Sequence, residues 1–410
     1  MKGMEGVPRS RPSVRWLNRT VLGIGLASLF SDWSHEIATT VLPAFLASMG
    51  AAAAWLGLIE GLADGLSSFA KVASGFYTDR LARRKKIAVL GYVVTTLGTG
   101  AIGLAGAAWH VLIARSLAWL GRGVRTPVRK ALLAAAVRPE TYGRAFGLER
   151  TMDTTGAIVG PLSAMLLLRA THLHYPMVFA WTLIPGFLAA AFIAFLVQEK
   201  ERVHVAHITF GDSLRALPPP FRKYLVAVGI FGIGDFAHTL LILLATQQLT
   251  PSLGASRAAG LAAAIYVLHN VFYASFSYIS GWLADRIDKR TLLATGYLMA
   301  AVMAAIIVLF PLTLSILIAV FILGGIYVAV EETLEDSLCA EMVDRAQHGM
   351  AFGMLATVNG IGDFVSSAVV GLLWTTYGTT AAFGYSAGLF SVGALLVARL
   401  KATPRSSRAC

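Results

Sequence analysis

The sequence predicts an all-α membrane protein with twelve transmembrane helices. Of its 410 residues, 56% are hydrophobic and only 14% are charged, whereas a soluble protein carries about a quarter charged residues. Apolar stretches of about 20 residues recur along the whole chain, and each is long enough to cross roughly 30 Å of hydrocarbon. These stretches are continuous rather than alternating, which favours helices over a membrane β-barrel.

Twelve apolar segments follow one another, each bounded by polar or turn-forming residues. In chain order they are 21–48, 54–77, 87–107, 110–135, 145–168, 177–197, 224–249, 259–282, 292–311, 314–338, 351–375 and 380–399.

Lysine and arginine are concentrated in alternate connections between these segments. The connections after the odd-numbered segments contain only Arg169 and Arg257, whereas the other connections and both termini carry nearly all the rest. By the positive-inside rule both termini are expected in the cytoplasm, and an even number of spans agrees. We expect a multi-pass protein of the inner cell membrane that works as a monomer in the lipid bilayer. The net charge of +12 then reports topology, and no nucleic-acid partner is expected.

Several protein classes are disfavoured by motifs that are missing. The two cysteines, Cys339 and Cys410, form neither a disulfide framework nor a metal-thiolate site. No G-x-x-x-x-G-K-[ST] loop occurs, so ATP is not the expected energy source, and no cofactor is expected. Two G-x-G-D tetrapeptides, at Gly232 and Gly360, resemble an intramembrane aspartyl protease signature, but the partner Tyr-Asp dipeptide is absent, so we expect no enzyme.

An internal repeat divides the chain into two halves. GFYTDRLARR begins at Gly75 and GWLADRIDKR at Gly281, 206 residues later. GRAFG at Gly143 and GMAFG at Gly349 are separated by the same interval, and SDWSH and GDFAH by 203 residues. Such repeats predict two similar bundles of six helices. The polar stretch between them sets the expected organisation: tail 1–20, bundle 21–197, linker 198–223, bundle 224–399 and tail 400–410.

The first repeat carries a family resemblance. Gly75, Asp79, Arg80, Arg83 and Arg84 follow the loop pattern G-x-x-x-D-R-x-G-R-R of the major facilitator superfamily, with Ala82 at the glycine. A second copy uses Gly281, Asp285, Arg286 and Arg290, with Asp288 at that position. The chain resembles this family over residues 15–400. The resemblance implies two six-helix bundles around a pseudo-twofold axis, with a central cavity built mainly from the first, fourth, seventh and tenth spans.

Two further matches to the family are partial. Arg115 and Gly121 fit R-x-x-x-G-x-G, although Trp119 replaces the first glycine. Gly156, Gly160 and Pro161 fit G-x-x-x-G-P-x-x-G-G, a pattern that in this family is typical of antiporters. The resemblance therefore implies export by antiport; small residues that let two helices approach explain the same pattern structurally.

Titratable residues near mid-span are the candidates for coupling and substrate binding, because a charge at the bilayer centre costs about 2.5 kcal/mol or more. Asp32, His35 and Glu36 lie in the first span and Asp235 and His238 in the seventh. The spacing Asp-x-x-His places acid and imidazole on one helical face. Three interpretations stay open: proton coupling or substrate contact, a transition-metal site made by Asp32, His35, Asp235 and His238, or polar packing between helices. The set is completed by Arg122, His269 and Asp363.

Opposite charges occupy equivalent positions of the fourth and tenth spans. Arg125, Arg129 and Lys130 correspond, after 206 residues, to Glu331, Glu335 and Asp336. We expect these residues to form a gate, with ion pairs such as Arg125 to Glu331 and Arg129 to Glu335. Charged residues of the two repeat loops are expected to assist the gate by stabilising one arrangement of the helices. These residues are Asp79, Arg80, Arg83, Asp285 and Arg286. The alternatives are that Arg122 binds an anionic substrate group or that these are snorkelling helix ends.

Together these observations predict a secondary transporter. We expect it to move a small charged or zwitterionic solute by alternating access, driven by the proton gradient. The alternatives are a transporter of a transition metal or a siderophore chelate and, from other classes, a lipid flippase or a membrane sensor on the same fold.

Overall fold

The structure is a computed structural model, and it describes residues 15–51, 53–81, 83–199 and 209–400. Expectations that concern the tails 1–14 and 401–410, Ala82 or residues 200–208 fall outside this part of the chain. The described residues form fifteen α-helices and three 3-10 turns: α1 (Arg19–Ser48), α2 (Ala53–Arg80), α3 (Lys85–Ala101), η1 (Ile102–Leu104), α4 (Ala108–Ala136), η2 (Pro139–Thr141), α5 (Tyr142–Ala170), α6 (Tyr175–Trp181), α7 (Leu183–Leu196), α8 (Phe210–Arg215), α9 (Pro219–Gly232), α10 (His238–Leu253), α11 (Ala255–Ala284), α12 (Lys289–Leu309), α13 (Leu314–Met342), η3 (Arg345–Gln347), α14 (His348–Tyr377) and α15 (Thr379–Ala398).

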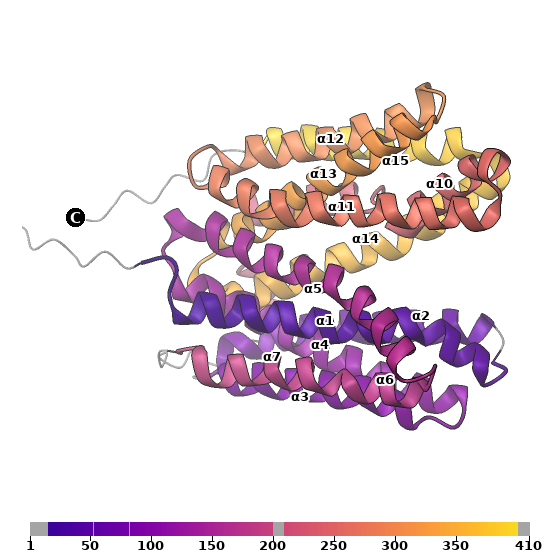
Figure 1. Cartoon of the computed structure of the whole chain (residues 1–410). Helices are drawn as coiled ribbons and strands as arrows, with labels where there is room; N and C mark the ends of the chain where they lie inside the picture. The colour runs from indigo at the N-terminus through magenta and orange to yellow at the C-terminus, as the bar shows by residue number, and fades with distance from the viewer. Residues whose placement is uncertain (1–14, 52, 82, 200–208, 401–410) are drawn as a thin grey trace, which may run out of the picture.

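The helices form two bundles, as the internal repeat predicts. Figure 1 shows α1 to α7 as one layer and α9 to α15 as the other. The bundles meet mainly along two helix pairs, α5 with α11 and α2 with α14. The first half ends with α7, the second begins with α9, and both of these points lie at the same end of the molecule as the start of α1. We call this the linker end, and the opposite one the far end.

The helices differ in how apolar they are. Eight helical stretches of the described chain are long and apolar enough to cross a membrane. Helices α1, α2 and α4 are not among them, and each carries charged residues within its apolar stretch. Because a charge is costly in lipid, these helices must turn their charged faces toward the protein interior.

The seventh span is not the continuous helix 224–249 that the sequence predicts. It forms as α9 and α10, separated by the five residues Ile233–Ala237. Gly232 and Gly234 weaken the helix at this point, since glycine costs about 1 kcal/mol in a helix interior. Asp235 therefore lies in the break and not on the same helical face as His238, which is the first residue of α10.

Other helices satisfy the backbone groups that this break releases. The hydroxyl of Tyr385 donates to the Ile233 carbonyl at 2.9 Å, and that of Ser366 donates to the Asp235 carbonyl at 2.6 Å. The N–H of Ala237 donates to the Ser367 hydroxyl at 3.3 Å. Within a membrane, irregular backbone persists only with such internal partners.

The sixth span is also interrupted. The predicted segment 177–197 forms as α6 and α7, which are separated at Thr182. Pro185 has no N–H to continue the helical ladder. The Thr182 carbonyl accepts the Gly186 N–H at 3.1 Å and also the Ser34 hydroxyl at 2.8 Å, and the second bond ties this break to α1.

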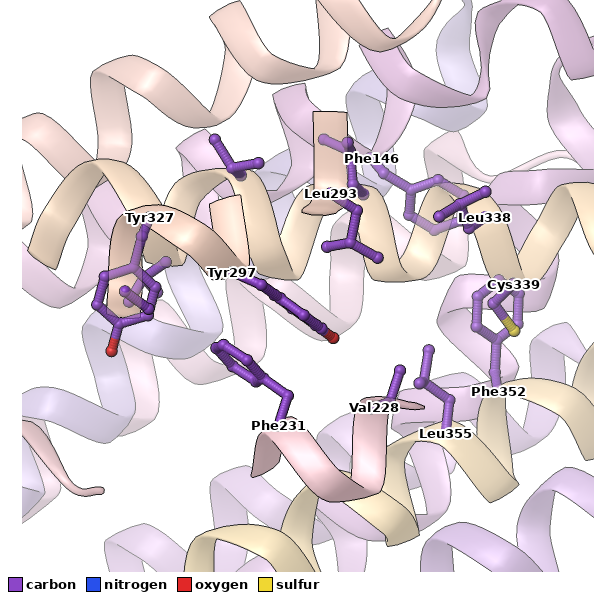
Figure 2. Packing of buried hydrophobic residues seen from close by; sticks show 14 of the residues in the cluster. Phe146, Val228, Phe231, Leu293, Tyr297, Tyr327, Leu338, Cys339, Phe352 and Leu355 are labelled. Carbon is purple, nitrogen blue, oxygen red and sulfur yellow. The ribbon is translucent and has the colours of Figure 1, made fainter. Parts of the chain in front are cut away.

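Aromatic packing fixes α9 within the second half. Figure 2 shows the ring of Phe231 lying flat against Tyr297, with a centroid distance of 3.7 Å. Phe390 also packs against Phe231, with a centroid distance of 4.7 Å. All three rings are fully buried, so the residues at the end of α9 hold a defined position just before the break.

Candidate functional site: a charged cavity between the two halves

The two repeat loops connect the halves at the linker end. Asp79, at the end of α2, accepts hydrogen bonds from the N–H groups of Gly349 and Met350 at 2.8 and 2.7 Å. These amides open α14, so the carboxylate sits at a helix N-terminus, where a negative charge is favourable. Asp79 therefore joins α2 of the first half to α14 of the second.

The second loop makes the equivalent contact. Asp285, which follows α11, accepts from the N–H of Gly143 at 2.9 Å and from the Arg144 guanidinium at 2.7 Å. The expected guanidinium partner thus comes from the opposite half. Arg286 instead lies over the Trp282 ring, with its guanidinium carbon 3.6 Å from the centroid, and Arg80 lies in the same way over Phe76.

Four glycines allow this close approach. Gly75 packs against Gly349, and Gly143 packs against Gly281. An added Cβ on any of them would overlap the backbone of the opposite glycine. The loop motif that begins at Gly75 thus packs against the GMAFG motif of the second half. In the same way, the loop motif that begins at Gly281 packs against the GRAFG motif of the first half.

Next to these crossings, ion pairs link the halves. Lys130 of α4 contacts Asp336 of α13 at 2.6 Å, and Arg150 of α5 contacts Glu332 at 2.6 Å. Lys130 and Asp336 occupy equivalent positions of the repeat, 206 residues apart. The predicted link between the fourth and tenth spans is therefore present.

The two specific ion pairs suggested by the sequence are wrong. Arg129 contacts Glu149 of its own half at 2.8 Å and not Glu335. Glu335 accepts hydrogen bonds from the Tyr297 hydroxyl at 2.5 Å and the Asn359 amide at 2.7 Å. Arg125 faces the ring of Tyr92 at 4.0 Å instead of Glu331. Repeat equivalence fixes the positions along the helices, but helix rotation decides which side chains meet.

The predicted cluster on the first span is held within the first half. Asp32 forms an ion pair with Arg122 at 3.1 Å. The ring of His35 is buried edge-on against Trp119, with a centroid distance of 5.3 Å. Glu36 lies on the same helix, half-buried against Gly160 of α5. The Asp32–Arg122 pair thus places a carboxylate of α1 beside Arg122, which lines the central cavity.

The corresponding residues of the second half make separate contacts. Asp235 accepts a hydrogen bond from the Tyr327 hydroxyl at 3.0 Å. His238 packs edge-on against His269 at 4.8 Å, and Nδ1 of His269 lies 3.0 Å from the Phe321 carbonyl oxygen. His269 is thus a buried packing residue of α11.

The proposed metal set is not assembled. Within the described part of the chain, no group of three or more His, Cys, Asp or Glu side chains is arranged to hold a metal ion. The metal-site interpretation of Asp32, His35, Asp235 and His238, one of the three that the sequence left open, therefore has no support from the described residues. The break before α10 and the Asp32–Arg122 pair direct these side chains to different partners.

Two adjoining cavities lie between the halves. The first, of about 190 Å³, is bounded on the first-half side by cations, and these are Lys71, Arg122, Arg125, Arg129, Lys130 and Arg150. The second, of about 410 Å³, lies in the second half around the break before α10, and its lining includes Asp235, Glu331 and Asp363. Glu332, Glu335, Asn359 and Asp363 line both cavities, which are therefore adjacent.

Sequence reasoning missed two members of this site. Arg150 bridges the halves, and Glu149 takes the partner that was assigned to Glu335. Both belong to the predicted segment 145–168, where adjacent charges in an apolar stretch were the available signal.

Two helical bundles around a charged internal cavity define a membrane transporter. The family model of the Major Facilitator Superfamily matches residues 24–242 and 224–409, and the chain belongs to that superfamily. Its members are transporters and not enzymes. The resemblance that the loop motifs indicate is thereby confirmed.

Relatives carry the same assignment. The chain is 28% identical over 370 residues to an uncharacterised MFS-type transporter of Methanocaldococcus jannaschii, a match that covers 90% of this chain and 92% of the relative. It is 26% identical over 306 residues to the multidrug resistance protein MdtH of Photorhabdus laumondii, covering 73% of each chain.

Solved structures share the fold. The outward conformation of the transporter FucP matches with a TM-score of 0.77 and 16% identity, over 95% of this chain and 100% of that one. A bacterial homologue of the iron transporter ferroportin in an outward-facing state matches with a TM-score of 0.75 and 13% identity, over 93% and 99%.

Proposed function

We propose that the protein is a secondary active transporter that exchanges a small charged or zwitterionic solute for protons by alternating access. It works as a monomer in the inner membrane, with the linker end and both termini in the cytoplasm. The direction of transport is export.

The cavity carries this proposal, because it combines fixed charges of both signs. Its first-half wall is cationic and its second-half wall is acidic. A neutral sugar would leave the buried charges that have no internal ion pair, such as Arg125 and Glu331, without counter-charges, and such charges are costly in a low-dielectric interior. A solute that carries charge compensates them during its passage.

The closed linker end supports alternating access. The ion pairs that join the halves, including Lys130–Asp336 and Arg144–Asp285, lie in the linker-end part of the helices. Transport then requires these contacts to separate while the far end closes. Two structural neighbours, FucP and the ferroportin homologue, were solved in outward states, which agrees with a closed cytoplasmic end.

Three observations support proton-driven export. The Asp32–Arg122 pair lies beside the cavity, and protonation of Asp32 would remove its attraction for the arginine. Relatives named multidrug resistance protein support the direction, as does the partial antiporter motif around Pro161.

The test uses purified protein in liposomes that contain a pH-sensitive dye and carry an imposed pH gradient. Amino acids, polyamines, cationic drugs and metal salts are added one class at a time. We expect one class to trigger proton movement in the wild type and none to do so in Asp32→Asn. The matched control is Asp288→Asn, because Asp288 is an exposed N-cap of α12 and an asparagine can still cap the helix.

Three results would count against the proposal. Solute uptake without proton movement would contradict proton coupling. Proton movement of equal size in Asp32→Asn would show that Asp32 is not needed for coupling. A response to metal salts alone would favour the metal transporter instead.

A further inference from the structure

The break between α9 and α10 opens onto a pocket with an unusual charge. Of the residues that line it, five are acidic, namely Asp235, Glu331, Glu332, Glu335 and Asp363, and none is lysine or arginine. At about 410 Å³, it falls in the volume range of small-molecule sites. We call it the acidic pocket.

Not all of these carboxylates are compensated within the described protein. Glu332 pairs with Arg150, and Asp235 and Glu335 accept hydrogen bonds from tyrosines. Glu331 is only 7% exposed, lines the pocket and has neither a hydrogen bond nor an ion pair with a described residue. Asp363 also lines the pocket, and its carboxylate is exposed to the cavity without such a partner.

On the first-half wall of the cavity, positive charge is left without an ionic partner. Arg122, Arg129, Lys130 and Arg150 all pair with carboxylates. Arg125 lines the first cavity and is only 3% exposed, yet its Nε and Nη1 atoms have no partner in the described chain. Once the internal ion pairs are subtracted, Lys71 and Arg125 remain on the first-half wall and Glu331 and Asp363 on the other, each without an ion pair to a described residue.

We infer that the acidic pocket binds an organic ammonium or guanidinium group of the transported solute, and that Arg125 binds an anionic group of the same molecule. The inference rests on the proposed function and specifies its substrate as a zwitterion held across the cavity. A cation beside Glu331 and an anion beside Arg125 would supply the missing counter-charges.

The pocket suits an organic cation better than a metal ion. Its carboxylates surround the space without forming a group that could hold a metal, as far as the described residues go. Its lining also includes the half-buried ring of Tyr266, and an aromatic ring favours an organic cation through cation–π contact.

The test measures the charge preference of each wall without knowing the solute. Single cysteines are placed at Thr239 in the acidic pocket and at Thr126 on the Arg125 wall, in a protein with Cys339→Ser and Cys410→Ser. Each is labelled with a cationic trimethylammonium and an anionic sulfonate thiol reagent. The ratio of the two rates at one cysteine cancels its thiolate fraction.

We expect Thr239→Cys to favour the cationic reagent by about tenfold or more, because a cleft lined by one charge concentrates the opposite ion. Thr126→Cys should show the reverse preference. Adding Asp363→Asn should reduce the preference at Thr239→Cys, and Arg125→Gln should reduce that at Thr126→Cys. Glu331→Gln provides a second acidic-wall variant if Asp363→Asn fails to fold. Asp288→Asn should leave both ratios unchanged.

Competition by small ions then tests whether each wall binds an ion, beyond the effect of the local electrostatic potential on the labelling reagents. At matched ionic strength, methylammonium should slow labelling of Thr239→Cys severalfold more than sodium does, and acetate should slow labelling of Thr126→Cys more than chloride does. Equal rates for both reagents, or methylammonium acting no better than sodium, would overturn the inference. Neither result depends on transport, so a failure here is distinct from a failure of proton-coupled exchange.

Discussion

At the residue scale, the contact between Lys130 and Asp336 is the most informative. The two side chains are 11% and 4% exposed, lie 2.6 Å apart and belong to opposite halves. A buried pair is not in itself a source of stability, but leaving one partner alone is costly, at about 3–5 kcal/mol. The pair therefore favours the state in which the linker end is closed.

Removing one partner should open this end. We expect Lys130→Met to abolish most transport and to increase labelling of linker-end cysteines. The double change Lys130→Asp with Asp336→Lys should restore part of the transport, because it preserves opposite charges at equivalent positions. Transport by reconstituted protein and cysteine labelling measure the two effects.

The pair between Lys289 and Glu341 provides the control. It has the same 2.6 Å separation but joins α12 to α13 within one half. We expect Glu341→Gln, which removes this pair but leaves Lys289 over the Tyr142 ring of the first half, to lower the melting temperature without changing linker-end labelling. A charge exchange at Lys130 and Asp336 that is as inactive as either single change would contradict the role of the pair.

At the element scale, the helix crossings control how closely the halves approach. Gly281 of α11 meets Gly143 of α5 with no room for a Cβ. Gly260 lies on the same helix, and a Cβ added there would meet no atom of another helix within 4 Å. The two positions thus separate a packing effect from a helix-propensity effect.

Gly281→Val should push α5 and α11 apart. Overpacking costs about 1–3 kcal/mol, so we expect the closed linker end to lose population, with longer distances between spin labels on the two halves. Gly260→Val carries the same valine on the same helix and should leave these distances unchanged. Unchanged distances in Gly281→Val would contradict the packing argument.

Asp285 acts on the same crossing through charge. It accepts bonds from the Gly143 N–H and the Arg144 guanidinium, and hydrogen bonds to charged groups contribute about 1.5–3 kcal/mol. We expect Asp285→Asn to shift the spin-label distances in the same direction as Gly281→Val. Asp288→Asn, three residues away but outside the crossing, should have no such effect, and equal shifts in both would contradict the assignment.

At the scale of the whole molecule, each half is expected to move largely as a rigid bundle. The hydroxyl of Thr151 on α5 donates to the Ala274 carbonyl on α11 at 2.9 Å, across the boundary between halves. The hydroxyl of Ser34 on α1 donates to the Thr182 carbonyl at 2.8 Å within the first half. Rocking must break the first contact and preserve the second.

Cross-linking distinguishes these two contacts. We expect a disulfide between Thr151→Cys and Ala274→Cys to stop transport and a reductant to restore it, because the linker end can no longer open. A disulfide between Ser34→Cys and Thr182→Cys should leave transport intact. Both pairs are made with Cys339 and Cys410 replaced by serine, and transport that continues through the first cross-link would exclude rocking about this boundary.

The sequence by itself determined the number of spans, the division into two halves and the positions of the charged residues. Hydropathy needs only local composition, and the repeat at Gly75 and Gly281 needs only comparison of the chain with itself. Even the opposite charges at Lys130 and Asp336 could be found in this way, since equivalent positions meet near a pseudo-twofold axis.

Only the tertiary structure decided the partners. Arg129 contacts Glu149 of α5, whereas Glu335 is bound by Tyr297 and Asn359 of its own half. The break around Asp235 persists because distant hydroxyls, among them that of Ser366, satisfy its backbone. Hydropathy and repeats are properties of position along the chain, whereas ion pairs and broken helices depend on which atoms other helices bring within hydrogen-bonding distance.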